Sequence, residues 1–470
     1  MPADVFSHQR GVFAEHLTAG AMNLPTTITE LMKELRRVYI DAEERGEVLD
    51  EKFIESAPES LDHLLAEIAG AAASYQHIDI KTFLLKTKAM LIKMDHKVQL
   101  SRNQASIYQH LASIGVPKSI HCVTLNLAEE YLVNAIARTS LPLPEHSYRL
   151  TNANYLHIVI ITDNILAASV AISSTVKSSK EPGKFVFHIV TDKKTSSAMH
   201  AWFSLNSVFP AVVEVKGLHQ FDWPPYASAR VMVTVEEVHQ GLMAYREYSG
   251  GDEDYRRLEG LSPNSFLLLN YLRIHLPELF PNLKRVILLD DDVVVQRDLT
   301  PLWDLDLNDN IIGAVGLEHN RESHCPGPML GHYFNFSNSL LPSELEQDQC
   351  AWLGGMNIFD LEAWSRTNIT ATFQQMLRLN RESGFLLWRL GWLPPAIIAF
   401  NSKVHPIDPS WQLPGLGQQL PAPETLKTSA VLHFSGPRKP WLEIGFPELR
   451  NLWMNHLNHS DEFLTSCRVV

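Results

Sequence analysis

Apolar and polar residues follow two different periodicities along this chain. Up to about residue 115 the apolar side chains recur three or four positions apart, as they do between Ile28 and Val38, and charged residues fill the gaps. This spacing is that of amphipathic helices, and it predicts two further helices at about 101–111 and 126–136. The Pro-rich stretch 141–144 then breaks the pattern. We therefore interpret residues 1–150 as a helical stem or spacer without a catalytic constellation.

After residue 155, short apolar runs rich in β-branched residues replace the helical spacing, which is typical of buried strands. Such runs stand at 157–161, 185–191 and 286–289, and the helical pattern returns at about 166–176 and 265–276. Strands that alternate with helices indicate an α/β fold with a doubly wound, mostly parallel, Rossmann-like sheet. We assign this fold to residues 151–470.

Polar residues follow each of these strands directly. Thr162, Asp163 and Asn164 end the first strand, Asp192 ends the second, and the acidic triplet 290–292 ends the third. In doubly wound sheets, ligands bind beyond the carboxyl ends of the strands, so we expect a site at these positions. The sequence contains neither a Walker-type phosphate loop nor a G-x-G-x-x-G turn after a strand, so the ordinary nucleotide-cradling motifs are absent.

The acidic triplet lies between two apolar runs, 288–289 and 293–295. Alternation along an extended backbone turns the side chains of Asp290 and Asp292 to the same side. Two carboxylates there provide the hard oxygen ligands of Mg²⁺ or Mn²⁺, and such an ion can also bind a diphosphate. The alternative is a solvated acidic turn, but the buried-strand sequence on both sides favours the metal site.

A second candidate segment begins near the C-terminus, where an apolar pair leads into His433. The imidazole of His433 can serve as a nitrogen ligand of Mn²⁺. Gly436 lets the backbone approach a phosphate closely, and Lys439 carries a compact cation on a flexible stem. The alternative is a core histidine beside a Pro-rich turn. Together the two segments are complementary: acids for a metal, then a histidine and a lysine for a metal-bound diphosphate.

The overall composition narrows the class of protein. The chain has 40 Lys+Arg and 53 Asp+Glu, a net charge of −13 that argues against nucleic-acid binding. Apolar residues make up 45% of the chain, which excludes a disordered protein. No apolar run is long enough to span a bilayer, and the N-terminus lacks the apolar core of a signal peptide. The sequence as it stands predicts a soluble protein.

Taken in order, the motifs resemble those of the family 8 glycosyltransferases, and within them the plant galacturonosyltransferases of pectin synthesis. The resemblance extends from about Ser101 to the C-terminus. It rests on the segments 121–122, 129–131, 162–164, 270–273, 277–281, 289–292, 298–303, 355–361, 411–417 and 433–441. An Asp-x-Asp motif alone occurs in unrelated glycosyltransferases, but the order and extent of the full set make the resemblance specific.

The resemblance implies a GT-A catalytic domain that uses a UDP-sugar and Mn²⁺, with Mg²⁺ as the alternative ion. The implied metal ligands are Asp290, Asp292 and His433. The implied donor-binding residues are Thr162, Asp163, Asn164, Arg273, Asp291, Gly354, Gly355, Met356, Asn357, Gly436 and Lys439. We assign catalytic roles to two of them: Asp291, which the family places near the ribose or sugar, and Lys439, at the leaving diphosphate.

The implied reaction moves galacturonic acid from UDP-galacturonate to the end of homogalacturonan through an α-1,4 linkage, with retention of anomeric configuration. Arg273 is the candidate partner of the donor carboxylate. Where relatives outside the plant branch have an acidic–amide pair, this chain reads Leu393-Pro394-Pro395. These residues offer no nucleophile, which favours front-face attack by the acceptor hydroxyl. A transferase with another UDP-sugar donor and a non-catalytic scaffold subunit remain alternatives.

The resemblance also implies a Golgi location and complexes with related transferases, although the sequence shows no membrane anchor. Sequons at Asn335, Asn368 and Asn458 permit a lumenal location. Four cysteines, at 122, 325, 350 and 467, can form two disulfides with three possible pairings. Because donor and acceptor are both anionic, we expect a basic groove beside the metal, lined by residues such as Arg273, Arg438 and Lys439.

Overall fold

The computed structural model describes residues 117–248, 269–316, 328–388 and 391–469, together with short pieces between residues 54 and 101. The chain forms two compact units, residues 1–106 and residues 107–470. In the first unit residues 85–98 are helical, as the apolar spacing there predicts. The other helices expected before residue 115 lie largely outside the described residues.

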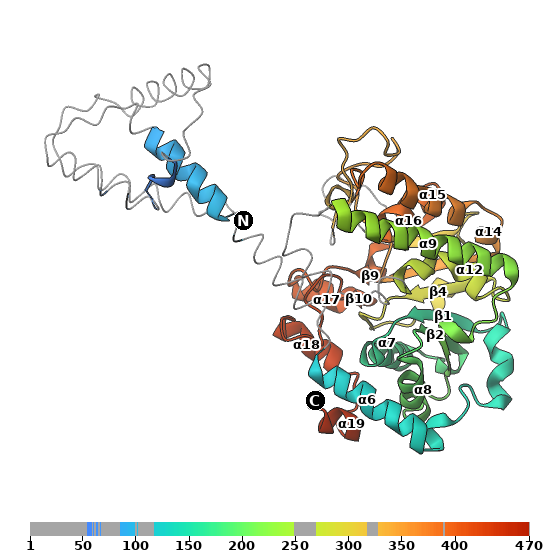
Figure 1. The fold of residues 1–470 in the computed structure, drawn as a ribbon. Coiled ribbons are helices and arrows are strands. Elements are labelled where there is room, and N and C mark those ends of the chain that lie inside the picture. The colour runs from blue at the N-terminus through green and yellow to red at the C-terminus, as the bar shows by residue number, and fades with distance from the viewer. Residues whose placement is uncertain are drawn as a thin grey trace, which may run out of the picture. The chain divides into compact units, whose positions relative to one another are not determined.

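Seven strands form the main sheet, in the order β3-β2-β1-β4-β7-β6-β8. They are β1 (Leu156–Ile161), β2 (Phe185–Thr191), β3 (Val212–Gly217), β4 (Arg285–Leu289), β6 (Ile312–Val315), β7 (Met356–Asp360) and β8 (Val404–Ile407). Four of the neighbouring pairs are parallel, whereas β7 runs antiparallel to both β4 and β6. The predicted α/β fold with a mostly parallel sheet is therefore confirmed (Figure 1).

A second, smaller sheet has three strands in the order β5-β10-β9. They are β5 (Val293–Val295), β9 (Gln412–Leu413) and β10 (Val431–His433). Only the acidic triplet separates β4 from β5, so the chain passes directly from the main sheet to the small one. The strand β10 pairs antiparallel with β5, and this pairing sets His433 opposite Val293, the residue that follows the triplet.

Helices cover both faces of the main sheet, because its central strands are apolar on both faces. Ile158 and Ile160 of β1 belong to one core, together with apolar residues of α7 (Ile165–Ser178) and α8 (Ser196–Leu205). Val159 and Ile161 belong to the other core. That core includes residues of α9 (Pro225–Tyr248), α12 (Leu276–Leu279), α14 (Leu361–Ser365), α15 (Ile369–Glu382) and α16 (Leu393–Phe400). Further short helices are α13 (Thr300–Trp303), α17 (Pro423–Thr428), α18 (Pro447–Met454) and α19 (Glu462–Ser466).

Two predicted helices differ from the observed ones. The helix expected at 126–136 is α6 (Lys118–Val133), which begins after Pro117 and ends at Asn134. The helix expected at about 265–276 is interrupted, since a 3₁₀ turn, η5 (Leu272–His275), precedes α12, and residues 265–268 lie outside the described residues. Pro277 accounts for the interruption, because proline has no N–H and its ring clashes with the carbonyl four residues earlier.

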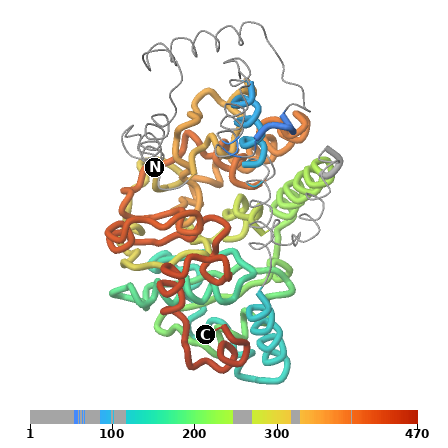
Figure 2. Tube along the Cα trace, turned by 90° about the vertical axis from the view of Figure 1, so that its left-hand side faces the viewer, coloured from blue at the N-terminus to red at the C-terminus, as the bar shows by residue number. Residues whose placement is uncertain are grey.

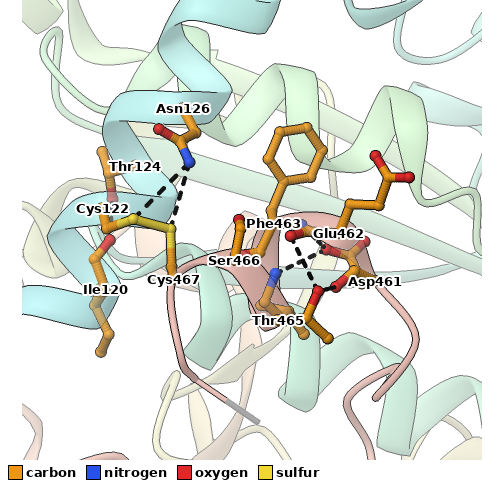
Figure 3. Close-up of a disulfide and its surroundings, with 11 residues drawn as sticks. Ile120, Cys122, Thr124, Asn126, Asp461, Glu462, Phe463, Thr465, Ser466 and Cys467 are labelled. Carbon is orange, nitrogen blue, oxygen red and sulfur yellow. Dashed lines mark hydrogen bonds between the residues drawn. A yellow bond between two sulfur atoms is a disulfide. The ribbon is translucent and has the colours of Figure 1, made fainter.

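The helix α6 is joined covalently to the C-terminal segment. Cys122 of α6 forms a disulfide with Cys467, which follows α19, and Asn126 donates a hydrogen bond from Nδ2 to Sγ of Cys467 at 3.4 Å (Figure 3). In Figure 2 the red C-terminal end accordingly lies beside the cyan α6. The predicted boundary near residue 150 therefore falls inside the second compact unit. Cys350 is also disulfide-bonded, and Cys325 lies outside the described residues.

No helix in the described part of the chain combines the length and the apolar character that a membrane crossing requires.

Candidate metal and nucleotide-sugar site

The adjacent parallel strands β2, β1 and β4 bring their carboxyl ends to one edge of the main sheet. The Thr162 hydroxyl, after β1, donates a hydrogen bond to the carboxylate of Asp291, after β4. Asp163 is half-buried, and burial together with the Asp192 carboxylate raises its pKa. Asn164 has a local role here, because its Oδ1 caps α7 by accepting a hydrogen bond from the Ala167 N–H at 3.1 Å.

Asp290, Asp292 and His433 converge on one point. One ligand atom from each lies within 4.8 Å of the other two. The Nε2 atom of His433 is 3.2 Å from Oδ1 of Asp292 and 3.6 Å from Oδ2 of Asp290. Asp292 and His433 are 5% and 7% exposed, so the group is largely shielded from water. The two sheets create this arrangement, because Asp290 follows β4 of the main sheet and His433 ends β10 of the small one.

Opposite charges keep two of the three carboxyl groups of the triplet ionised. Burial alone would raise the pKa of Asp290, but the Arg273 guanidinium and His433 outweigh it and lower that pKa. Burial also opposes ionisation of Asp292, yet Lys439 and His433 hold its pKa far below the usual range. For Asp291, burial and the neighbouring Asp292 charge raise the pKa to about 7, although the hydrogen bond from Thr162 opposes the rise.

Arg273 lies in η5, which packs on the face of the main sheet opposite α7. From there its side chain reaches the acidic triplet. Its guanidinium forms an ion pair with Oδ1 of Asp290 and lies 5.0 Å from the centre of the Trp392 ring, a cation–π contact. Arg273 is 8% exposed, and its Nε has no hydrogen-bond partner among the described residues. One N–H of this buried cation is therefore available to a further acceptor.

Lys439 lies in the loop after β10 and reaches back to the same site. Its ammonium donates hydrogen bonds to the Asp292 carboxylate and to the Phe434 carbonyl oxygen, the latter at 3.2 Å. Gly436, in the same loop, has a φ of +115°, and a Cβ there would lie 2.7 Å from the carbonyl carbon of Gly417. Such an approach between two backbone segments requires glycine.

A glycine turn before β7 completes the site. Gly354 and Gly355 have φ angles of +128° and +69°, which favour glycine. The Gly355 N–H donates a hydrogen bond to Oδ2 of Asp290 at 2.6 Å, and the Gly354 N–H donates one to Oδ1 of Asn357 at 2.9 Å. The N–H of Met356 is bound by Gln412. A Cβ on Gly354 would meet nothing closer than Oδ2 of Asp290 at 3.5 Å, so the turn leaves space beside the carboxylates.

The sequence profile of glycosyl transferase family 8 matches residues 122–445, which contain this whole site. The chain belongs to this family. It is 45% identical over 427 residues to the Arabidopsis thaliana protein named probable galacturonosyltransferase 14, covering 88% of this chain and 79% of the relative. It is 41% identical over 425 residues to probable galacturonosyltransferase 12 of the same plant, covering 88% of this chain and 78% of the relative.

Among solved structures, the chain is similar to the galactosyltransferase LgtC in complex with donor and acceptor sugar analogs. The likeness has a TM-score of 0.42 and 17% identity and covers 66% of this chain and 100% of LgtC.

The residues of this family 8 transferase fit a divalent cation. Two ionised carboxylates and an imidazole nitrogen are a donor set that suits Mn²⁺ and related ions. The converging atoms are those of Asp290, Asp292 and His433, and the carboxylates are already ionised well below neutral pH because of the cations beside them.

Arg438 was expected to line a basic groove beside the metal. Arg438 donates a hydrogen bond to the Gln418 carbonyl oxygen at 3.2 Å and lies 4.9 Å from the centre of the Phe446 ring, so its described contacts are not with the acidic triplet. Pro394 and Pro395 are buried in the first turn of α16.

The sequence reasoning assigned no role to two residues of the family 8 site: Gln412, which holds the glycine turn, and Trp392, which packs on Arg273. A lone glutamine or tryptophan carries no local pattern that marks such contacts, since they form between segments far apart in the sequence.

Proposed function

We propose that this chain transfers galacturonic acid from UDP-galacturonate to the growing end of homogalacturonan, forming an α-1,4 linkage in pectin biosynthesis. The activity is that of a polygalacturonate 4-α-galacturonosyltransferase that retains the anomeric configuration. Relatives named probable galacturonosyltransferase match 88% of the chain and support the choice of donor. The single observation that carries the proposal is the convergence of Asp290, Asp292 and His433 in a chain of family 8.

We assign Mn²⁺ to this group, with Mg²⁺ as the alternative. Asp290, Asp292 and His433 would hold the ion, which when bound supplies Lewis-acid stabilisation of a leaving diphosphate. Lys439 places its ammonium group at the Asp292 carboxylate, where it can neutralise charge that develops on the leaving oxygen. Gly436 lets the backbone of the same loop come close to the phosphates.

The donor is proposed to lie along the glycine turn. Gly354, Gly355, Met356 and Asn357 border the space beside the carboxylates, where a sugar ring can be accommodated. Thr162, Asp163 and Asn164 are assigned to the nucleoside at the end of β1. Asp291, held by the Thr162 hydroxyl, is assigned a contact with the ribose or sugar.

Arg273 is the proposed partner of the galacturonate carboxylate. Its Nε is buried without a partner in the described part of the chain, while another nitrogen binds Asp290. A guanidinium can donate to two carboxylates at once because its donors form a planar fork. This contact would distinguish a sugar acid from a neutral sugar.

The acceptor hydroxyl is proposed to attack from the face that the diphosphate leaves. Leu393, Pro394 and Pro395 carry no nucleophilic group, which favours this front-face route over a covalent enzyme intermediate. The short-lived cationic sugar would be stabilised by the departing diphosphate itself.

Product mass provides the test of the proposed function. The chain is incubated with UDP-galacturonate, Mn²⁺ and short oligogalacturonides, and we expect acceptors longer by whole galacturonate units. If the acceptor is extended only with UDP-glucose, UDP-galactose or UDP-xylose, that nucleotide sugar is the donor and the chain is a related transferase. No transfer with any donor, from a folded chain that binds Mn²⁺, would favour a scaffold role in a transferase complex.

The proposed location is the Golgi lumen, in homo- or hetero-complexes with related transferases. The Cys122–Cys467 disulfide supports an oxidising compartment, because disulfides rarely persist in the cytosol.

A further inference from the structure

Gln412 bridges two peptide groups at the edge of the proposed metal centre. Gln412 lies on β9 and is 8% exposed. The side-chain Oε1 accepts a hydrogen bond from the Met356 N–H at 2.8 Å, and Nε2 donates one to the Gly354 carbonyl oxygen at 3.2 Å. One amide therefore holds the backbone on both sides of Gly355.

Gly355 in turn is bound to the first residue of the acidic triplet. Its N–H donates to Oδ2 of Asp290 at 2.6 Å, and its carbonyl oxygen accepts from the Asp290 N–H at 2.8 Å. A Cβ on Gly355 would lie 2.6 Å from Nδ1 of His433 and 2.8 Å from Cδ of Gln412. Gly355 is thus packed among two candidate metal ligands, Asp290 and His433, and the amide of Gln412.

This bridge connects the two sheets that supply the metal ligands. Gln412 pairs with Val431 between β9 and β10, two residues before His433. Met356 pairs with Leu289 between β7 and β4, one residue before Asp290. No strand pairing between the two sheets is described at this point. The Gln412 amide therefore links β9, the neighbour of the strand that carries His433, directly to the turn that orients Asp290.

We propose that Gln412 is a positioning residue for the metal centre, acting through Gly355 to fix the Asp290 carboxylate relative to His433. The proposal rests on the metal-dependent function stated above. A primary amide suits this role, because it offers an acceptor to one peptide group and a donor to the other. Groups that orient metal ligands typically change metal affinity by about 10–100-fold when they are removed.

The test compares Gln412→Met, which keeps length and loses both hydrogen bonds, with Gln412→Asn, which keeps the amide but is too short to span both partners. Gln419→Met, an exposed glutamine in the loop that follows β9, is the matched control. Mn²⁺ affinity is measured on the full chain by calorimetry and by electron paramagnetic resonance, without donor sugar. We expect affinity about 10–100-fold weaker in both Gln412 variants and unchanged in the control.

A second readout separates positioning from general damage to the fold. If Gln412 positions the ligands, saturating Mn²⁺ restores the kcat of each folded variant, and the loss is confined to the Mn²⁺ concentration that gives half activity. A kcat that stays low at saturating Mn²⁺, with wild-type Mn²⁺ affinity, would overturn the proposal. Gln412→Asn retains a polar group in the buried position, so it keeps the test valid if Gln412→Met does not fold.

Failure of the proposed function would look different. A wild-type chain that binds Mn²⁺ but transfers no galacturonate would overturn the proposed donor and leave the Gln412 result standing. Wild-type Mn²⁺ affinity in both folded Gln412 variants would overturn the positioning role whatever the donor is.

A separate observation distinguishes the three sequons. At Asn335 the amide Nδ2 donates to the Leu386 carbonyl oxygen at 3.0 Å, and at Asn368 the sequon's Thr370 is 8% exposed with its hydroxyl bound to the Ile274 carbonyl oxygen at 3.3 Å. Asn458 and Ser460 are both exposed. The Oδ1 of Asn458 accepts from the Ser460 N–H at 3.1 Å, and neither the Asn458 Nδ2 nor the Ser460 hydroxyl has a partner within the described residues.

We infer that Asn458 is an N-glycosylation site of the folded chain. This inference rests on the lumenal location proposed above. The Asn458 Nδ2 would bond to the anomeric carbon of a lipid-linked oligosaccharide, with release of the lipid diphosphate and loss of one amide proton. The exposed turn before α19 keeps both sequon groups in solvent, and the nearby Cys122–Cys467 disulfide indicates the same compartment.

The test expresses the full chain in a eukaryotic secretory pathway and maps glycans by enzymatic removal in heavy-oxygen water, followed by peptide mass spectrometry. We expect the label at Asn458 and a mobility shift that Asn458→Gln abolishes, whereas Asn335→Gln and Asn368→Gln serve as matched controls that leave the Asn458 label intact. An unlabelled Asn458 in a chain whose Cys122–Cys467 disulfide has formed would overturn the inference.

Discussion

The Nε2 atom of His433 lies 3.2 Å from Oδ1 of Asp292, while Lys439 donates a hydrogen bond to the other oxygen of the same carboxylate. The Asp292 carboxylate is therefore shared by the imidazole of His433, a candidate metal ligand, and the ammonium group of Lys439. In the proposed mechanism Asp292 acts by holding the metal, whereas Lys439 acts directly on the leaving diphosphate. Changes at Asp292 and at Lys439 should therefore have different effects.

Asp292→Ala removes a carboxylate ligand, and we expect it to abolish measurable Mn²⁺ binding and to lower galacturonosyl transfer by at least about 100-fold. The physical reason is that a bound metal stabilises the transition state of such reactions by several kcal/mol. Each loss of about 1.4 kcal/mol lowers the rate roughly tenfold. Calorimetry and product mass provide the measurements. Asp304→Ala, at an exposed position, is the control. Unchanged transfer by Asp292→Ala would show that the chemistry occurs elsewhere.

Lys439→Met should separate metal binding from catalysis. Removing the ammonium deletes a cation from the leaving group, and we expect kcat to fall by roughly 100-fold, the usual effect of losing one charge-stabilising donor. Mn²⁺ affinity should hold or increase, because Asp292 loses a competing cation. Steady-state kinetics and calorimetry test this. The control is Lys427→Met, whose side chain is 75% exposed. A large loss of Mn²⁺ affinity in Lys439→Met would contradict the assigned role.

The buried pair of imidazoles between β1 and β2 should make stability depend on pH. His157 Nδ1 and His188 Nε2 are 3.0 Å apart, His188 contacts Glu214, and the Asn152 carbonyl faces His157. Burial, and then the His188 charge, lower the pKa of His157 to about 4 from an ordinary value of 6.5. The folded state thus favours the neutral ring, so its contribution is complete above pH 6.5 and is lost as the pH falls towards 4.

We expect the free energy of unfolding to decrease by roughly 1–3 kcal/mol over that interval, at about 1.4 kcal/mol per unit of pKa shift. Urea unfolding at a series of pH values measures it, and His157→Gln should give a shallower slope. His456, whose pKa burial also lowers to about 4, is present in both proteins and cancels in the comparison. Equal slopes for the two proteins would refute the prediction.

The disulfide between α6 and the C-terminal segment should stabilise the second unit. It joins residues 345 apart in sequence, so it restricts the unfolded chain over nearly the whole unit. We expect Cys467→Ala to lower the free energy of unfolding by about 2–5 kcal/mol. Denaturant midpoints test this, with Ser466→Ala as the control. Cys122→Ala and the double variant should match the single one, since each removes the same bond; additive losses would contradict that account.

The sequence predicted the parts of the fold and site that depend on local pattern. The strands β1, β2 and β4 lie within one residue of the expected positions, because buried parallel strands are continuous apolar runs. The acidic triplet and His433 were recognisable because each follows such a run.

What the sequence did not reveal depends on contacts between distant segments. The antiparallel placement of β7 beside β4 and the small sheet that carries His433 follow from tertiary packing, not from periodicity. Asn164 is proposed to contact the donor, and its oxygen also caps α7, a second use of the side chain that no spacing rule predicts. Gln412 binds a turn that lies more than fifty residues earlier, so no local signal could mark it.

The ion pairs at the triplet also affect how a charged donor would reach the site. Arg273 and Lys439 each contact one of the three adjacent carboxylates, so the centre is close to electrical neutrality although the chain carries −13. A divalent ion then makes the centre positive within a molecule that remains negative overall. Dissolved salt screens the negative charge elsewhere on the chain more than it screens the shielded centre. Encounter with an anionic nucleotide sugar should therefore become faster, not slower, as the ionic strength rises.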